Sequence, residues 1–224
     1  MRLRAKAILG LVHLDAWMLV LTLWPAGTFS YWQAWVFQAV FTVCTLAITL
    51  WLMKHDPALL ERRTQAGPVA EGEASQKLIQ AIASVAFVAI FVVSGLDHRR
   101  GWTHLPEAFV VVGDGLVALG LYLVFRVFAE NTFTSAIIET APGQQVISTG
   151  PYAVVRHPMY VGALVMLAGV PLALGSVVGL VALAPMSLVI MARAVAEERY
   201  LDTHLPGYAG YRARVRYRFV PRVW

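Results

Sequence analysis

The chain alternates long apolar runs with short polar connections. Four runs are clearly long enough to cross a bilayer as helices, and two more follow them: roughly 8–24, 32–53, 78–96, 109–128, 159–174 and 177–196. A helix needs about 20 predominantly apolar residues to span the hydrocarbon core of a membrane. The pattern therefore predicts an all-α fold, a polytopic membrane helix bundle of about six transmembrane helices.

The fifth run is short and contains several residues that favour bends. Gly162, Gly169 and Pro171 lie within it, and Gly175-Ser176 separates it from the sixth run. Gly and Pro at these positions favour a turn between the two runs. We expect the fifth run to form a tight hairpin with the sixth or to tilt. The alternative is five spanning helices, with the last two runs forming a re-entrant pair.

Composition supports a membrane protein with one domain. Hydrophobic residues make up 58% of the 224 residues and charged residues 14%, whereas a soluble domain has about 25% charged residues. We expect a single integral-membrane domain over residues 1–224, with an N-terminal four-helix part (1–128) and a C-terminal region (129–224). The single cysteine, Cys44, lies in an apolar run, so the sequence predicts neither a disulfide framework nor a metal site.

Positive charge is strongly biased to one side of the predicted bundle. Of the 18 Lys and Arg, all except Arg99 and Arg100 lie in the segments that six spans place on one side: 1–7, 54–77, 126–158 and 193–224. Positive residues favour the cytoplasmic side, so both termini are predicted to be cytoplasmic. The net charge of +5 is then explained by topology and by contact with anionic lipid head groups, and it does not point to nucleic acid.

A first polar cluster stands at the start of the fifth run. It contains Tyr152, Arg156, His157 and Tyr160, and polar side chains at a membrane edge usually serve a function. The preceding Thr149-Gly150-Pro151-Tyr152 has the residues of a turn, whose exposed backbone groups suit a nucleobase or an amino-acid moiety. His157-Pro158 opens the next helix, and a helix N-terminus favours a carboxylate.

A second polar cluster closes the sixth run. Arg193 and Glu197 are four residues apart and share one helix face. They form either a simple ion pair or a site in which Arg193 holds an anionic substrate and Glu197 accepts hydrogen bonds from ribose hydroxyls or an ammonium. Asp114, inside the fourth run, is a further candidate. Glu130 and Asn131 follow that run, where they are placed to support the first cluster.

Several well-known chemical motifs are absent from the sequence. It contains no glycine-rich phosphate loop, no paired cysteines, no H-E-x-x-H and no G-x-S-x-G. Gly113-x-Gly115-x-x-Ala118 imitates a dinucleotide fingerprint. It lies in the middle of an apolar run with no strand before it, so it does not predict such a site.

The two polar clusters together resemble the isoprenylcysteine carboxyl methyltransferase family, which is grouped with integral-membrane phospholipid methyltransferases. The resemblance covers residues 126–224. The residues that carry it are Asn131-Thr132-Phe133, Gly150-Pro151-Tyr152, Arg156-His157-Pro158-x-Tyr160-x-Gly162, Arg193, Glu197-Glu198, Leu201, Gly207-Tyr208-x-x-Tyr211, Val215 and Pro221.

The resemblance implies that S-adenosylmethionine is the methyl donor, held in a cytosolic-facing cofactor pocket built from the C-terminal half. It also implies that Arg193 is the substrate-binding and catalytic residue, facing the carboxylate of a lipid-borne acceptor. The residues that would contact the donor are Gln144, Gln145, Val146, Ile147, Tyr152, His157, Pro158, Met159, Tyr160 and Glu197.

The expected function is therefore methyl transfer from S-adenosylmethionine to the carboxylate of an isoprenylcysteine-like or other lipophilic acceptor. The expected partners are this small-molecule substrate and the lipids of a prokaryotic inner or cell membrane. Three alternatives remain at this point: a phospholipid or amine N-methyltransferase, an NADPH-dependent sterol-type reductase, and a non-catalytic membrane protein. The reductases carry a related Arg-His block, from which this chain departs at Met159 and Ala163.

Overall fold

The computed structural model describes residues 3–64 and 74–224, and these residues form helices and connections without a strand. This confirms the predicted all-α class. The α-helices are α1 (Leu3–Ala26), α2 (Trp32–His55), α3 (Pro57–Arg63), α4 (Ala74–Arg100), α5 (Glu107–Glu130), α6 (Pro158–Ala173), α7 (Leu183–His204) and α8 (Tyr208–Arg214). Two short 3₁₀ helices, η2 (Gly150–Ala153) and η3 (Val178–Ala182), precede α6 and α7.

Five helical segments of the described chain are long and apolar enough to cross a membrane: α1, α2, α4, α5, and η3 together with α7. The shorter α6 has 16 residues, a rise of about 24 Å, and a typical hydrocarbon core is about 30 Å thick. Six spans and the five-span alternative are both consistent with these lengths. The turn between α6 and α7 includes Gly175, whose φ of +68° is in the left-handed region.

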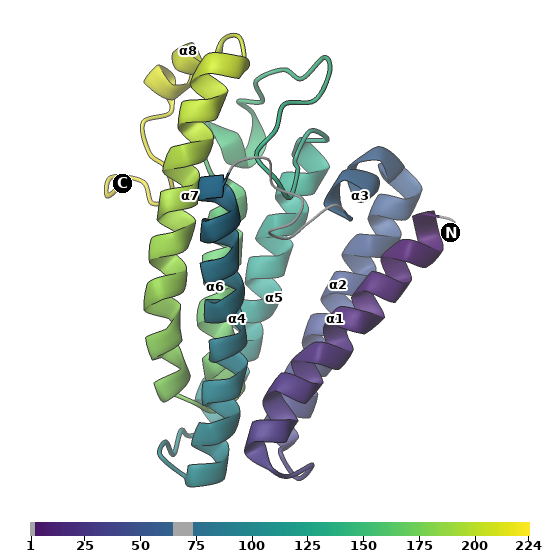
Figure 1. The fold of residues 1–224 in the computed structure, drawn as a ribbon, viewed down its shortest axis with the longest axis vertical. Coiled ribbons are helices and arrows are strands. Elements are labelled where there is room, and N and C mark those ends of the chain that lie inside the picture. Colours follow the sequence, from purple (N-terminus) through teal and green to yellow (C-terminus); the bar gives the residue numbers. More distant parts are fainter. Residues whose placement is uncertain (1–2, 65–73) are drawn as a thin grey trace.

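The long helices run alternately up and down, so that connections gather at the two ends of the bundle (Figure 1). One end holds the beginning of α1, the short helix α3, the connection 131–157 and helix α8. The opposite end holds the α4–α5 connection, next to Arg99 and Arg100, and the turn between α6 and α7. The two polar clusters therefore lie at the same end, as the sequence predicts. That this end faces the cytoplasm stays a prediction.

Helices α5 and α6 approach each other closely through glycines. A Cβ added at Gly120 would lie 2.5 Å from the carbonyl oxygen of Gly162, and one at Gly113 would lie 2.1 Å from the backbone nitrogen of Ala173. Helices in membranes commonly associate through small residues that let their backbones meet. Gly113 thus serves helix packing. The close contact also places the start of α6, with His157, beside the end of α5.

The opposite end of the bundle is tied together by a buried carboxylate. Asp97, at the end of α4, accepts hydrogen bonds from the Ser176 hydroxyl (2.5 Å) and from the backbone N–H of Thr103 (2.7 Å). The Tyr31 hydroxyl donates to the carbonyl of Leu174 at 2.5 Å. These contacts fix the α6–α7 turn against the N-terminal helices. The division of the single domain at residue 128 stays a prediction.

Candidate functional site

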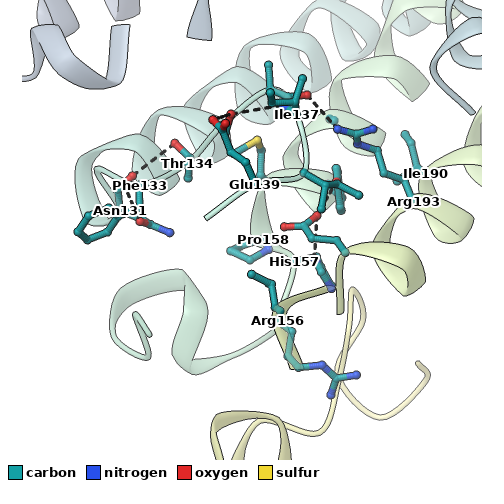
Figure 2. A pocket seen from close by; sticks show the side chains of 18 of the residues that line it. Asn131, Phe133, Thr134, Ile137, Glu139, Arg156, His157, Pro158, Ile190 and Arg193 are labelled. Carbon is teal, nitrogen blue, oxygen red and sulfur yellow. Dashed lines mark hydrogen bonds and ion pairs between the residues drawn. The ribbon is translucent and has the colours of Figure 1, made fainter. Parts of the chain in front are cut away.

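A cavity of about 510 Å³ lies between α4, α5, α6 and α7, under the connection 131–157. Its volume falls within the range of about 300–1,000 Å³ that is typical of ligand sites. Every residue that the family resemblance implicates in binding lines it: Gln144, Gln145, Val146, Ile147, Tyr152, His157, Pro158, Met159, Tyr160, Arg193 and Glu197. Figure 2 shows His157 and Pro158, at the start of α6, facing the same space as Arg193 of α7. What these residues bind stays a prediction.

Glu197 is held at the polar end of the cavity by Tyr160. The Tyr160 hydroxyl donates to Glu197 Oε2 at 2.7 Å, and His157 Nδ1 lies 3.9 Å from the same oxygen. The rings of His157 and Tyr160 stack with centroids 5.4 Å apart. The Glu197 side chain is nevertheless 31% exposed. It can therefore accept further hydrogen bonds from a ligand while its position is fixed.

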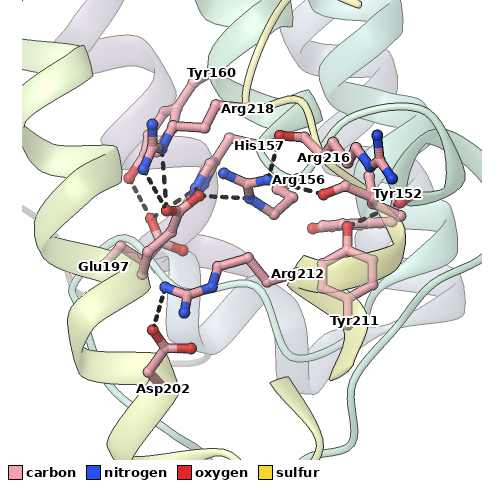
Figure 3. Close-up of polar contacts among 12 residues, drawn as sticks. Tyr152, Arg156, His157, Tyr160, Glu197, Asp202, Tyr211, Arg212, Arg216 and Arg218 are labelled. Carbon is pink, nitrogen blue, oxygen red and sulfur yellow. Dashed lines mark hydrogen bonds and ion pairs between the residues drawn. The ribbon is translucent and has the colours of Figure 1, made fainter. Parts of the chain in front are cut away.

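Glu198 has a different environment, although it is the next residue in the chain. Its side chain is buried: Oε1 accepts a hydrogen bond from Arg156 Nε at 2.7 Å, and Oε2 accepts one from Arg218 Nε at 3.0 Å. His157 Nε2 lies 3.2 Å from Oε1. Figure 3 shows the side chains of Arg156, His157 and Arg218 converging on one point beside Glu197. Glu198 therefore acts as a structural hub behind the cavity.

Arg156 connects Glu198 to the C-terminal segment, which consists of residues 215–224 after α8. Its Nη1 donates to the carbonyl oxygens of Val215 (2.8 Å) and Arg216 (2.6 Å). Its backbone N–H donates to the carbonyl oxygen of Tyr217 (2.9 Å). The backbone N–H of His157 makes a similar bond to the next carbonyl in the segment. The C-terminal segment is therefore docked along Arg156 and His157, on the side away from the cavity, and it holds this His157 motif in place.

The η2 turn presents Tyr152 to the cavity. Gly150 has a φ of +54°, as its place in a turn predicts, and a Cβ there would lie 2.6 Å from a carboxylate oxygen of Glu130. Asn131 Nδ2 donates to the Tyr152 hydroxyl at 3.0 Å, and the Tyr211 hydroxyl donates to the Tyr152 carbonyl at 2.8 Å. Burial raises the pKa of Tyr152, so its phenol remains neutral.

Arg193 lies on the wall of the cavity formed by α7. Its Nη2 donates to the carbonyl oxygen of Ala136 at 2.9 Å, which places the guanidinium beside the connection 131–139. The Tyr160 side chain lies close both to Arg193 and to Glu197. Arg193 and Glu197, which the sequence places on one helix face, are thus joined through Tyr160 of α6.

Two parts of the cavity were not anticipated from the sequence. Arg63 reaches it from α3, in the N-terminal half of the chain, where the sequence analysis places no candidate site residue. The membrane-side part of the cavity has apolar walls from α4, α5 and α7: Ile79, Ala83, Leu121, Val124, Val189 and Ile190. Asp114, the other candidate from the sequence, is buried in α5 and does not line this cavity.

Residues 108–206 match the family model described as phospholipid methyltransferase. The matched region extends from the start of α5 to the end of α7 and includes all of the residues that the sequence implicates in binding. The match confirms the predicted resemblance to the superfamily of integral-membrane methyltransferases, a family that generally uses S-adenosylmethionine. None of the curated proteins matches the chain.

Proposed function

We propose, from the phospholipid methyltransferase match over residues 108–206, that this membrane methyltransferase O-methylates the carboxylate of an isoprenylcysteine-like or other lipophilic acceptor. The observation that carries the proposal is the two-part character of one cavity. A polar end with Glu197 and Tyr160 continues into an end with apolar helix walls. A soluble donor and a lipid acceptor need such a shared space, because their reacting atoms must meet away from water.

The polar end has the groups that S-adenosylmethionine requires. Glu197 is fixed but open, so it suits ribose hydroxyls or the ammonium of the donor. Tyr152 and Tyr160 offer aromatic faces, and the backbone of residues 144–147 offers hydrogen-bonding groups along the same wall. When bound, S-adenosylmethionine supplies an electrophilic methyl group on a cationic sulfur.

The other end of the cavity suits an acceptor with a lipid tail. Its walls come from helices that also face the membrane, so a tail can enter between them. Arg193 stands between this apolar part and Glu197, and its guanidinium matches the geometry of a carboxylate. A carboxylate is already anionic, so the chain does not need to remove a proton. Its task is to orient the acceptor and exclude water, which accounts for large rate effects in bimolecular reactions.

A second candidate function is methyl transfer to a lipid amine, which the description of the matched family favours. An amine must lose a proton during the reaction, so a base is needed near the acceptor. Glu197 lines the cavity and retains an exposed carboxylate, whereas both oxygens of Glu198 are already occupied by cationic side chains. Glu197 would then have to serve both the donor and the proton transfer.

Transfer of a labelled methyl group separates the two functions. Purified protein in neutral detergent is given labelled S-adenosylmethionine with either N-acetyl-S-farnesylcysteine or phosphatidylethanolamine. We expect labelled farnesylcysteine product from which mild base releases volatile methanol, since methyl esters hydrolyse in base and N-methyl groups do not. Phosphatidylcholine, which has no free acid or primary amine, is the control lipid. Base-stable label in phosphatidylethanolamine alone would replace the carboxylate proposal with the amine one.

A further inference from the structure

Arg63 brings a cation into the cavity from the N-terminal half of the chain. Its Nη1 donates to the carbonyl of Ser135 at 2.8 Å and lies 3.9 Å from the sulfur of Met159. The guanidinium also lies over the ring of Phe128, 5.2 Å from its centroid. The last residue of the short helix α3 is thus held against the end of α5 and the start of α6, where it forms part of the cavity wall.

Arg63 and Arg193 reach neighbouring points on the same connection. Arg63 bonds the carbonyl of Ser135, and Arg193 bonds the carbonyl of Ala136. Burial, and next in size the opposing effects of the nearby Tyr160 and Arg193, leave the pKa of Arg63 lowered. A desolvated guanidinium close to a second one is stabilised when an anion binds beside it.

Within the described residues, the guanidinium of Arg63 does not use all of its hydrogen-bond donors. Arginine carries five N–H donors in a planar fork, and the contacts made by Arg63 to described residues involve Nη1 and the ring of Phe128. In the described ranges, neither Nε nor Nη2 of Arg63 is an atom that is both buried and without a hydrogen-bond partner. Because Arg63 lines the cavity, the donors that it does not use within the described residues are available to a ligand there.

We propose that Arg63 is a specificity-determining residue that binds, with Arg193, the anionic head group of the acceptor, either a carboxylate or a phosphate. This inference rests on the proposed methyltransferase function and deepens it. Arg63 and Arg193 bond adjacent carbonyls, and Arg193 is the residue proposed to bind the acceptor, which favours the acceptor over the donor as the source of the anion. Arg63 joins an element outside the matched family region to the site inside it.

Arg62 provides a matched control. It precedes Arg63 on α3 and donates to the carbonyl of Thr132, so it also holds the connection 131–139. It is not among the residues that line the cavity. A loss caused only by loosening this connection should therefore appear in Arg62→Gln and Arg63→Gln alike. A loss caused by anion binding should appear only in Arg63→Gln.

The test measures the binding of four probes that share a farnesyl chain and differ in the head group: a carboxylate, a phosphate, a neutral primary amide and an ammonium. Each is titrated into wild type, Arg63→Gln and Arg62→Gln in neutral detergent, with and without S-adenosylhomocysteine. We expect wild type to prefer an anionic probe over the amide. Arg63→Gln should reduce that preference about tenfold or more, because a charge-assisted hydrogen bond is lost. Arg62→Gln should keep it, and both variants should bind S-adenosylhomocysteine like wild type.

Each other result contradicts the inference. Wild type without an anion preference, an unchanged preference in Arg63→Gln, or an equal loss in Arg62→Gln would each remove the assigned role. A weakened affinity of Arg63→Gln for S-adenosylhomocysteine, with the probe preference intact, would assign the residue to the donor instead. Failure of wild type to bind S-adenosylhomocysteine counts against the proposed function, and the probe titrations without it still decide the role of Arg63.

Discussion

Replacing Glu198 by alanine is expected to lower the free energy of unfolding by about 3–5 kcal/mol, the usual cost of removing one partner from a buried ion pair. Arg156 is itself buried and makes its only described carboxylate contact with Glu198. Arg218 would lose the same partner, so the C-terminal segment should detach from the His157 motif. Thermal unfolding in detergent measures the stability, and trypsin cleavage after the arginines of residues 212–218 measures the detachment.

Two variants define how this result is interpreted. Glu198→Gln keeps the shape of the side chain and one acceptor oxygen, so it should lower the free energy of unfolding by less than Glu198→Ala does. Arg212→Ala breaks the ion pair between Arg212 and Asp202, whose side chains are 46% and 24% exposed respectively. It should lower the free energy of unfolding by less than about 1 kcal/mol. If Glu198→Ala unfolds and resists trypsin like wild type, the hub does not hold the C-terminal segment.

Arg193→Ala is expected to bind S-adenosylhomocysteine like wild type and to lose acceptor turnover by on the order of 100-fold. The expected loss is that of a charge-assisted, bidentate contact with a carboxylate in a water-poor site. Arg193→Lys keeps the charge without the planar guanidinium, so its acceptor turnover should lie between those of wild type and Arg193→Ala. Values of kcat/KM from labelled methyl transfer, with the donor affinity measured separately, check both parts. Normal turnover by Arg193→Ala would remove the role assigned to this residue.

The fold was largely predictable because its determinants are local. The length and apolarity of each run decide whether it can span a bilayer, and neither depends on the neighbouring helices. The turn at Gly150 and the helix that begins after His157 are likewise determined by short stretches of sequence. Alternation of the helices then brings the two polar clusters to one end, as a simple count of spans predicts.

The parts of the site that escaped prediction depend on packing between distant segments. Glu197 and Glu198 are adjacent in the sequence, and only the fold reveals that Glu197 is open to the cavity while Glu198 is buried among cations. Arg63 belongs to a short amphiphilic helix that no local motif connects to a pocket. The docking of residues 215–218 on Arg156 is made mostly through backbone carbonyls, which leave no signature in the side-chain sequence.

The most direct test of the account is a calorimetric titration of detergent-purified protein with S-adenosylhomocysteine, with NADPH titrated in parallel. We expect saturable binding of S-adenosylhomocysteine to wild type, no saturable binding of NADPH, and loss of the former in Glu197→Ala. This result would support both the donor and the role of the carboxylate that Tyr160 positions. Binding of NADPH without S-adenosylhomocysteine would contradict the account in favour of a reductase, and binding of neither ligand to folded protein would contradict it in favour of a non-catalytic membrane protein.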